Sequence, residues 1–216
     1  MSVKDLTNLP AQVLARLEAR GVDPFVVTRG GRLVEVMRFV PSEIRFDEGG
    51  NPTVDGYATT YEDEYDVAGG APYGWSETIA RGAADKSVKE RDDVRLLVNH
   101  EGLALAITKS NTLSLASDKT GLRSVATLDG SSPTVQSLVS AMQRGDMDEM
   151  SFAFRAIRQE WNEDYTERRI LEVKLYDVSV VTYPANPATS VHVRSGEGAM
   201  SLSLARVAAD ALRQTA

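Results

Sequence analysis

The sequence predicts an α+β domain whose mainly antiparallel β-sheet closes into a small barrel flanked by helices. Strand-like segments outnumber helical ones and are separated by short turns rich in glycine, asparagine and proline. Their order also lacks the regular strand–helix alternation of a doubly wound parallel sheet. The 216 residues suffice for one substantial domain at 36–194, with an N-terminal arm at 1–35 and a helical tail at 195–216.

The N-terminal half is expected to begin with a helix. Pro10 suits a first helical turn, and the apolar residues that follow it share one face. Strand candidates fill residues 23–67, with breaks expected at a pair of glycines and at Pro41. Residues 76–93 are interpreted as mainly helical, because Ser76 can serve as an N-cap.

The C-terminal half carries the most apolar strand candidates. Residues 94–100 are almost continuously apolar, which predicts a central strand buried on both faces. Two or three further strands are expected within 103–129, followed by a helix over 133–144 that starts with proline and ends at glycine. Residues 149–161 and 168–183 are predicted to form two long strands around a polar hairpin.

The composition excludes several kinds of chemistry. The chain has no cysteine, which rules out disulfides, thiolate nucleophiles and cysteine-ligated metals, and it has only two histidines. Its formal net charge of −7 argues against a nucleic-acid-binding surface. No apolar run approaches the roughly 18–20 residues of a membrane span, and we expect no secretory signal. No phosphate-binding glycine motif or GxSxG elbow is present, and neither a metal nor a cofactor is expected.

The two histidines are the candidates for a base that works at neutral pH. His100 lies at the exit of the apolar strand 94–100, where solvent or a cleft begins. His192 alternates with two valines and is interpreted as the outward face of an edge strand. Lone histidines are more often structural than catalytic, so the pattern alone leaves both roles open.

Two other polar residues stand out on predicted strands. Ser151 begins a strand whose phenylalanines face the opposite way, which would make a rigid platform for a nucleophile, although serine is common at strand starts. Asp177 falls among apolar residues of the same parity, and a buried carboxylate costs several kcal/mol unless it is paired. It therefore needs a partner, such as a histidine. The alternative is a bulge at Tyr176-Asp177 that turns the carboxylate out to water.

Six stretches in this order and spacing resemble the prohead proteases of tailed bacteriophages, a serine peptidase family related in fold to the herpesvirus maturation proteases. The resemblance covers about residues 40–193. It departs from the family at Ala106-Ile107, where members often have a glycine. The stretches are GYATTY, ETIARGAADKSV, VRLLVNHE, TLSLASDKTGLRSVATL, MSFAFRA and LYDVSVVTYPANPAT.

The resemblance implies a herpesvirus-protease-like fold and a serine endopeptidase. The histidine of the NH motif, His100, would be the general base, and the serine of MSF, Ser151, the nucleophile. Asp177 would orient the histidine, with Glu172 as the runner-up. The herpesvirus relatives use a second histidine in this role, which His192 could supply.

The resemblance also implies partners and a location. The expected substrates are the scaffold or capsid-precursor proteins, and the protease itself, cleaved inside the procapsid in the host cytoplasm. Related viral proteases gain activity by association, so a homo-oligomer is expected, with no nucleic acid or membrane as partner. One alternative is an inactive assembly module that keeps the fold, against which the joint presence of the three candidate residues argues. Another is a hydrolase using the acidic segment 61–66, which is interpreted as a solvated loop.

Overall fold

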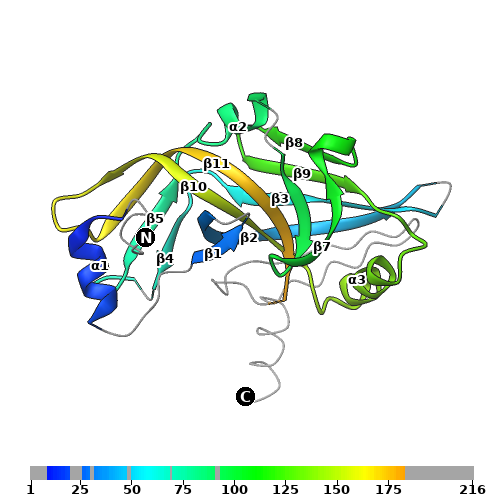
Figure 1. Ribbon diagram of the computed structural model, residues 1–216, viewed down its shortest axis with the longest axis horizontal. Coiled ribbons are helices and arrows are strands. Elements are labelled where there is room, and N and C mark those ends of the chain that lie inside the picture. The colour runs from blue at the N-terminus through cyan, green and yellow to red at the C-terminus, as the bar shows by residue number, and fades with distance from the viewer. Residues whose placement is uncertain are drawn as a thin grey trace, which may run out of the picture.

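The structure is a computed structural model (Figure 1) that describes residues 9–19, 26–29, 32–47, 50–68, 70–90 and 93–182. His192 and the tail predicted at 195–216 lie outside these residues.

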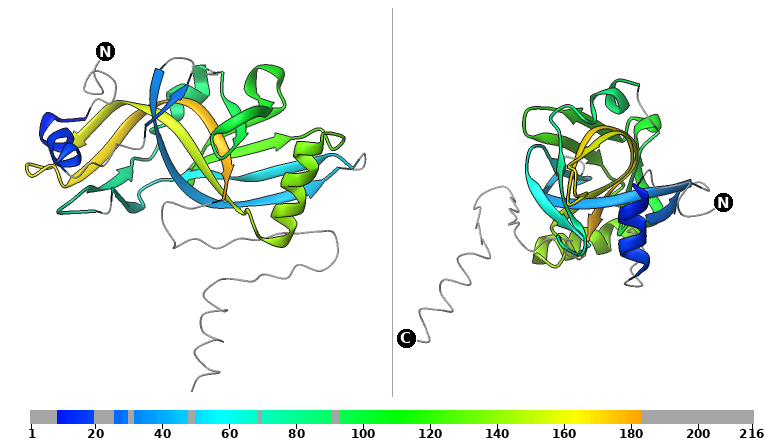
Figure 2. Two further views of the ribbon diagram at one scale, coloured as in Figure 1. Left: turned by 60° about the horizontal axis from the view of Figure 1, so that its bottom comes forward. Right: turned by 90° about the vertical axis from the view of Figure 1, so that its left-hand side faces the viewer.

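Eleven strands join into one curled sheet (Figure 2). The main path of neighbouring strands is β4-β5-β11-β10-β2-β3-β9-β8, with β1 paired to β2 and the β6–β7 hairpin attached to β11. The strands are β1 (Val26–Arg29), β2 (Arg32–Phe46), β3 (Pro52–Thr60), β4 (Glu64–Val67), β5 (Trp75–Ile79), β6 (Arg95–Val98), β7 (Glu101–Ile107), β8 (Leu113–Ser117), β9 (Gly121–Thr127), β10 (Glu149–Trp161) and β11 (Glu167–Val181).

The sheet is mainly antiparallel, as predicted, but the predicted closure into a barrel is wrong. Among the described strands no ladder joins the two ends of the path, β4 and β8. The sheet instead branches along β11. This strand pairs in parallel with β5 through Glu167–Ile170 and with β6 through Asp177–Val180, while β10 occupies its other edge.

The strand β2 passes through Pro41 without a break, contrary to the expectation from the sequence. Before and at this residue β2 pairs with β10, and from Ser42 onward it pairs with β3. Proline lacks a backbone N–H and is tolerated where a ladder changes partner. Pro41 therefore marks the exchange of neighbours and not the end of the strand.

The long hairpin of β10 and β11 runs across the molecule as two adjacent curved ribbons (Figure 1). Asn162 Oδ1 closes its tip by accepting the backbone N–H groups of Thr166, at 2.9 Å, and Glu167, at 3.1 Å. At the opposite end of β10, Phe152 and Phe154 stack in the core with ring centroids 4.6 Å apart. This confirms the predicted strands and places Ser151 and Ala153 on the face opposite the two rings.

Among the described residues, three α-helices and a 3₁₀ turn accompany the sheet, namely α1 (Ala11–Glu18), α2 (Asp85–Glu90), α3 (Pro133–Arg144) and η2 (Thr108–Ser110). The predicted first and third helices are confirmed, and α3 ends at Gly145 with a φ of +76°. The first helix belongs to the core cluster through Val13, Leu14 and Leu17. No helix in the described part of the chain is long and apolar enough to cross a membrane.

The predicted helix over 76–93 is largely wrong, because Trp75–Ile79 form β5 and helix α2 begins only at Asp85. Every second residue of β5 is buried, which is the period of a strand. One of these buried residues is Glu77, whose carboxylate is fully enclosed with the guanidinium of Arg168 at 2.9 Å. Pairing with β11 beside this ion pair outweighs the capping tendency of Ser76.

Candidate active site

His100 lies in the two-residue turn that joins β6 to β7. The turn is closed by Val98 and Glu101, which are paired, and both central residues have left-handed backbones, with φ of +51° at Asn99 and +59° at His100. Positive φ at both central positions is the pattern of a type I′ turn, in which glycine is strongly favoured. A histidine there is held in an uncommon conformation, which is a recurrent property of functional sites.

The turn is fastened to the end of β11. The backbone N–H of Asn99 donates to the carbonyl of Val180 at 2.9 Å. The side chain of Asn99 accepts the backbone N–H of Thr182 at 2.9 Å, and its amide lies 3.0 Å from the hydroxyl of that threonine. The parallel β6–β11 ladder is thus extended into the turn, which fixes the direction of the next side chain, His100.

Ser151, His100 and Asp177 form a continuous hydrogen-bonded chain. His100 Nε2 lies 2.8 Å from Ser151 Oγ, and His100 Nδ1 lies 2.6 Å from Asp177 Oδ1. All three residues are buried, with exposures of 0% for the serine, 6% for the histidine and 1% for the aspartate. An ionised carboxylate only accepts, so Nδ1–H donates to Asp177 and Nε2 is left to accept the serine proton.

The β10–β11 ladder explains why the serine and the aspartate share one face. Ser151 is directly opposite Ser179, and Ala153 is opposite Asp177. The bulge of the alternative interpretation is present, because pairing then jumps to Leu175 and leaves Tyr176 as the extra residue. It does not turn Asp177 toward water, because the carboxylate is buried against His100.

Ser179 is a further polar residue of the site that sequence reasoning missed. It is fully buried, and its Oγ accepts the backbone N–H of His100 at 3.1 Å and donates to Asp177 Oδ1 at 3.2 Å. The available signal was its parity, since it lies two residues beyond Asp177 on the same strand face.

The other sequence candidates lie elsewhere. Glu172, the runner-up for the third position, binds Lys86 Nζ at 2.9 Å and lies 3.7 Å from Arg158 Nε. The hydrogen bond to this carboxylate raises the pKa of the Lys86 ammonium. Glu172 is therefore engaged in a surface ion pair outside the hydrogen-bonded chain of the site. His192, the other alternative, lies outside the described residues.

The prediction that the acidic segment 61–66 is a solvated loop is only half right. Its carboxylates are exposed, but Tyr61 and Tyr65 are buried and the segment runs into β4. Glu62 accepts the backbone N–H of Arg81 and binds the guanidinium of Arg169, both at 2.8 Å, and these bonds lower its pKa. In the described part of the chain no cluster of three His, Asp or Glu side chains could hold a metal ion.

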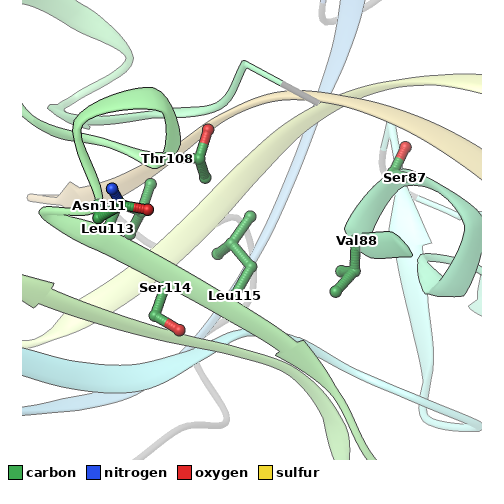
Figure 3. Close-up of a pocket in the computed structure, with 7 residues that line it drawn as sticks. All are labelled: Ser87, Val88, Thr108, Asn111, Leu113, Ser114 and Leu115. Atoms are coloured by element: carbon green, nitrogen blue, oxygen red, sulfur yellow. The ribbon is translucent and has the colours of Figure 1, made fainter. Parts of the chain in front are cut away.

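A pocket of about 250 Å³ lies between α2, η2 and β8 (Figure 3). The hydroxyl of Ser87 at its rim is already used, because it donates to the carbonyl of Val173 and accepts the backbone N–H of Leu175. No residue of the hydrogen-bonded chain lines the pocket. The lining residues are Ser87, Val88, Thr108, Asn111, Leu113, Ser114 and Leu115.

Comparison with known proteins identifies a family for this chain. The family model described as caudovirus prohead serine protease matches residues 41–202, well over half of the chain. Among solved structures, the capsid assembly protease of bacteriophage T4 is similar at 16% identity, with a TM-score of 0.42, over 68% of this chain and 90% of that one. No curated protein matches the sequence. The match over residues 41–202 establishes that the chain belongs to the caudovirus prohead serine protease family.

Proposed function

We propose that the protein is a serine endopeptidase of phage head maturation with Ser151 as nucleophile, His100 as general base and Asp177 as the residue that orients the base. The observation that carries the proposal is the hydrogen-bonded chain of 2.8 Å and 2.6 Å through the imidazole. Both distances fall within the reach that proton transfer from a nucleophile requires. Membership of a family of prohead proteases supports proteolysis as the reaction.

The chemistry follows from the direction of the hydrogen bonds. His100 Nε2 takes the Ser151 proton while Oγ attacks the peptide carbonyl, which gives a tetrahedral oxyanion. The imidazolium then gives that proton to the amide nitrogen, the C–N bond breaks, and an acyl-enzyme remains. His100 then deprotonates a water molecule, which attacks the ester and gives a second tetrahedral intermediate. When this intermediate collapses, the C–O bond to Ser151 breaks and His100 returns the proton to Ser151 Oγ. Asp177 stabilises the imidazolium in both halves of the reaction.

The proposed substrates are the scaffold and capsid-precursor proteins, cleaved inside the assembling procapsid in the host cytoplasm. Self-cleavage is proposed too, because Thr182, the residue directly after β11, is bonded to Asn99 beside the base. Full burial of Ser151 implies that the surrounding chain moves before a carbonyl reaches Oγ. A site that must open before it can act suits an enzyme that is active only after assembly. The expected homo-oligomer and the domain limits at 36–194 stay predictions.

The test is cleavage of the purified capsid precursor of the same phage by wild type and by Ser151→Ala. Wild type should cut, and the variant should leave the precursor intact over the same time. A fluorophosphonate probe should label wild type at Ser151 and leave the variant unlabelled. An inactive assembly module would give no cleavage and no labelling with either protein. Equal cleavage by both proteins would show that another residue is the nucleophile.

A further inference from the structure

We propose that Ser179 is a positioning residue, whose hydroxyl holds the backbone of His100 and the carboxylate of Asp177 in the arrangement that points the imidazole at Ser151. This inference rests on the proposed function, in that the positioning serves the proposed triad. The Ser179 hydroxyl contacts both members of the His100–Asp177 pair. Its effect on this pair can therefore be measured without any cleavage of substrate.

One atom meets both partners of the imidazole. Ser179 Oγ lies 3.1 Å from His100 N, 3.2 Å from Asp177 Oδ1 and 3.2 Å from His100 Nδ1. The hydroxyl has a single proton. Because the Nδ1 proton is directed at Asp177, the hydroxyl proton also goes to that carboxylate, while a lone pair accepts the His100 N–H. Ser179 therefore links the backbone of the base to the carboxylate that orients it.

The His100 N–H needs a partner from outside its own hairpin. In a tight turn the closing hydrogen bond joins the first and fourth residues, so the N–H of His100, the third, is not used by the turn. This group is buried beside β11, and an unpaired buried N–H costs about 1–3 kcal/mol. The Ser179 hydroxyl removes that cost only when the turn keeps the left-handed conformation that aims the imidazole toward Ser151.

The place of Ser179 in the ladder suits this role. It is the residue directly opposite Ser151, and Asp177 lies two residues before it on the same face. The imidazole of His100 spans from Asp177 to Ser151, so it passes close to this position. A short side chain is required there, and Ser179 is short while still carrying the hydroxyl that both neighbours use.

The chain offers a matched control in Ser87. This serine is also buried, and its hydroxyl likewise donates once and accepts once, donating at 2.9 Å to the backbone carbonyl of Val173 and accepting at 3.1 Å from the backbone N–H of Leu175. Ser87→Ala removes a comparable hydroxyl from a comparable environment away from the proposed triad. Thermal unfolding of Ser87→Ala and Ser179→Ala therefore measures how much stability is lost when a buried serine hydroxyl is removed at each position.

The first measurement uses Ser151→Ala protein, which should not cleave itself. The Nδ1 proton of His100, shared with Asp177, should give a low-field proton NMR resonance. Adding Ser179→Ala should shift this resonance or broaden it beyond detection, whereas adding Ser87→Ala should leave it in place. The same resonance should disappear in the Asp177→Ala control, which assigns it.

The second measurement is steady-state cleavage by otherwise wild-type protein. Ser179→Ala should lower kcat by about 10- to 100-fold, which corresponds to losing one hydrogen bond to a charged group. KM should stay within about 2-fold, because the proposed role of Ser179 is exerted through His100 and Asp177 and not through the substrate. Ser87→Ala should leave both constants near those of wild type.

If Ser179→Ala does not fold, Ser179→Cys carries the test, since its side chain has the same shape, is only slightly larger, and is a poor hydrogen-bond partner. It should show the same loss of kcat. An unchanged resonance, a kcat equal to that of Ser87→Ala, or a resonance change without a fall in kcat would each overturn the proposal. Failure of the proposed function appears separately, either as cleavage that survives Ser151→Ala or as no cleavage by wild type. In both cases the resonance still tests whether Ser179 holds the histidine–aspartate pair.

Discussion

His100 Nδ1 and Asp177 Oδ1 lie 2.6 Å apart, although 77 positions separate them in the chain. Two backbone irregularities make the contact possible. The left-handed turn brings the imidazole back over β11, and the bulge at Tyr176 moves Asp177 off the face occupied by Leu175. The pair is thus built by local backbone geometry at both ends, and each end can be tested by substitution.

The acidic end of the pair is tested by Asp177→Asn. The amide can donate to Nδ1, which favours the tautomer with the proton on Nε2, and this nitrogen can then no longer accept from Ser151. We expect kcat to fall by on the order of 10³–10⁴, with little change in KM and an unchanged circular dichroism spectrum. Glu172→Gln makes the same chemical change at the runner-up carboxylate and should leave kcat unchanged. An Asp177→Asn enzyme within tenfold of wild type would contradict the assignment.

The backbone of the turn is tested by comparing His100→Gly with His100→Ala. Both variants lose the base and should not cleave the precursor. Their stabilities should differ, because the φ of +59° at this position is accessible to glycine and costs alanine about 1 kcal/mol or more. Urea unfolding should therefore show the glycine variant to be the more stable of the two by roughly that amount. Equal unfolding midpoints would mean that the turn does not impose a left-handed residue.

Much of the fold could be predicted from the sequence, because apolar periodicity decides it. The long strands around the Asn162 hairpin, the helix ending at Gly145 and the opposite faces of Ser151 and Phe152 all follow from period 2 or period 3.6 patterns. The branching along β11 could not be predicted from these patterns. A strand that exchanges one neighbouring strand for another has the same apolar periodicity as a strand that keeps one neighbour throughout. Strand β5 was missed because its buried Glu77 hides the alternation of a strand.

The candidate site shows a similar division. Asp177 was marked by its parity and its need for a partner, which are local properties. The turn at Asn99 and His100 was not predicted, because a histidine in a type I′ turn is too rare to be recognised without the contacts that hold it. Ser179 was missed since its role depends on an N–H that only the turn directs toward β11. Periodic patterns in the sequence identify residues on a helix or strand. Contacts between turns and bulges can be identified only from the three-dimensional structure.

Asp148 gives a prediction on pH. Partial burial raises the pKa of its carboxyl above the ordinary value, so ionisation is less favourable in the folded than in the unfolded chain. The resulting cost is absent below the unfolded pKa, grows as pH rises, and is fully present above the folded pKa. Asp148→Asn should therefore stabilise the protein at neutral pH, by less than about 1 kcal/mol because the side chain is still partly exposed, and should have no effect in acid. Urea unfolding at both pH values measures this, and an equal gain at both would contradict it.

Adjacent arginines at the start of β11 give a prediction with a built-in control. Arg168 is fully buried and binds Glu77 at 2.9 Å, whereas the ion pair between Arg169 and Glu62, at 2.8 Å, is largely exposed. Arg168→Met leaves a carboxylate buried without its cation and should lower the free energy of unfolding by about 3–5 kcal/mol. Arg169→Met makes the same change in a solvated pair and should cost less than about 1 kcal/mol. Urea unfolding of the two variants in the Ser151→Ala background gives the difference, and similar costs would mean that the Arg168 pair is hydrated in solution. A Glu77→Leu substitution added to Arg168→Met should then recover stability, because it removes the stranded charge.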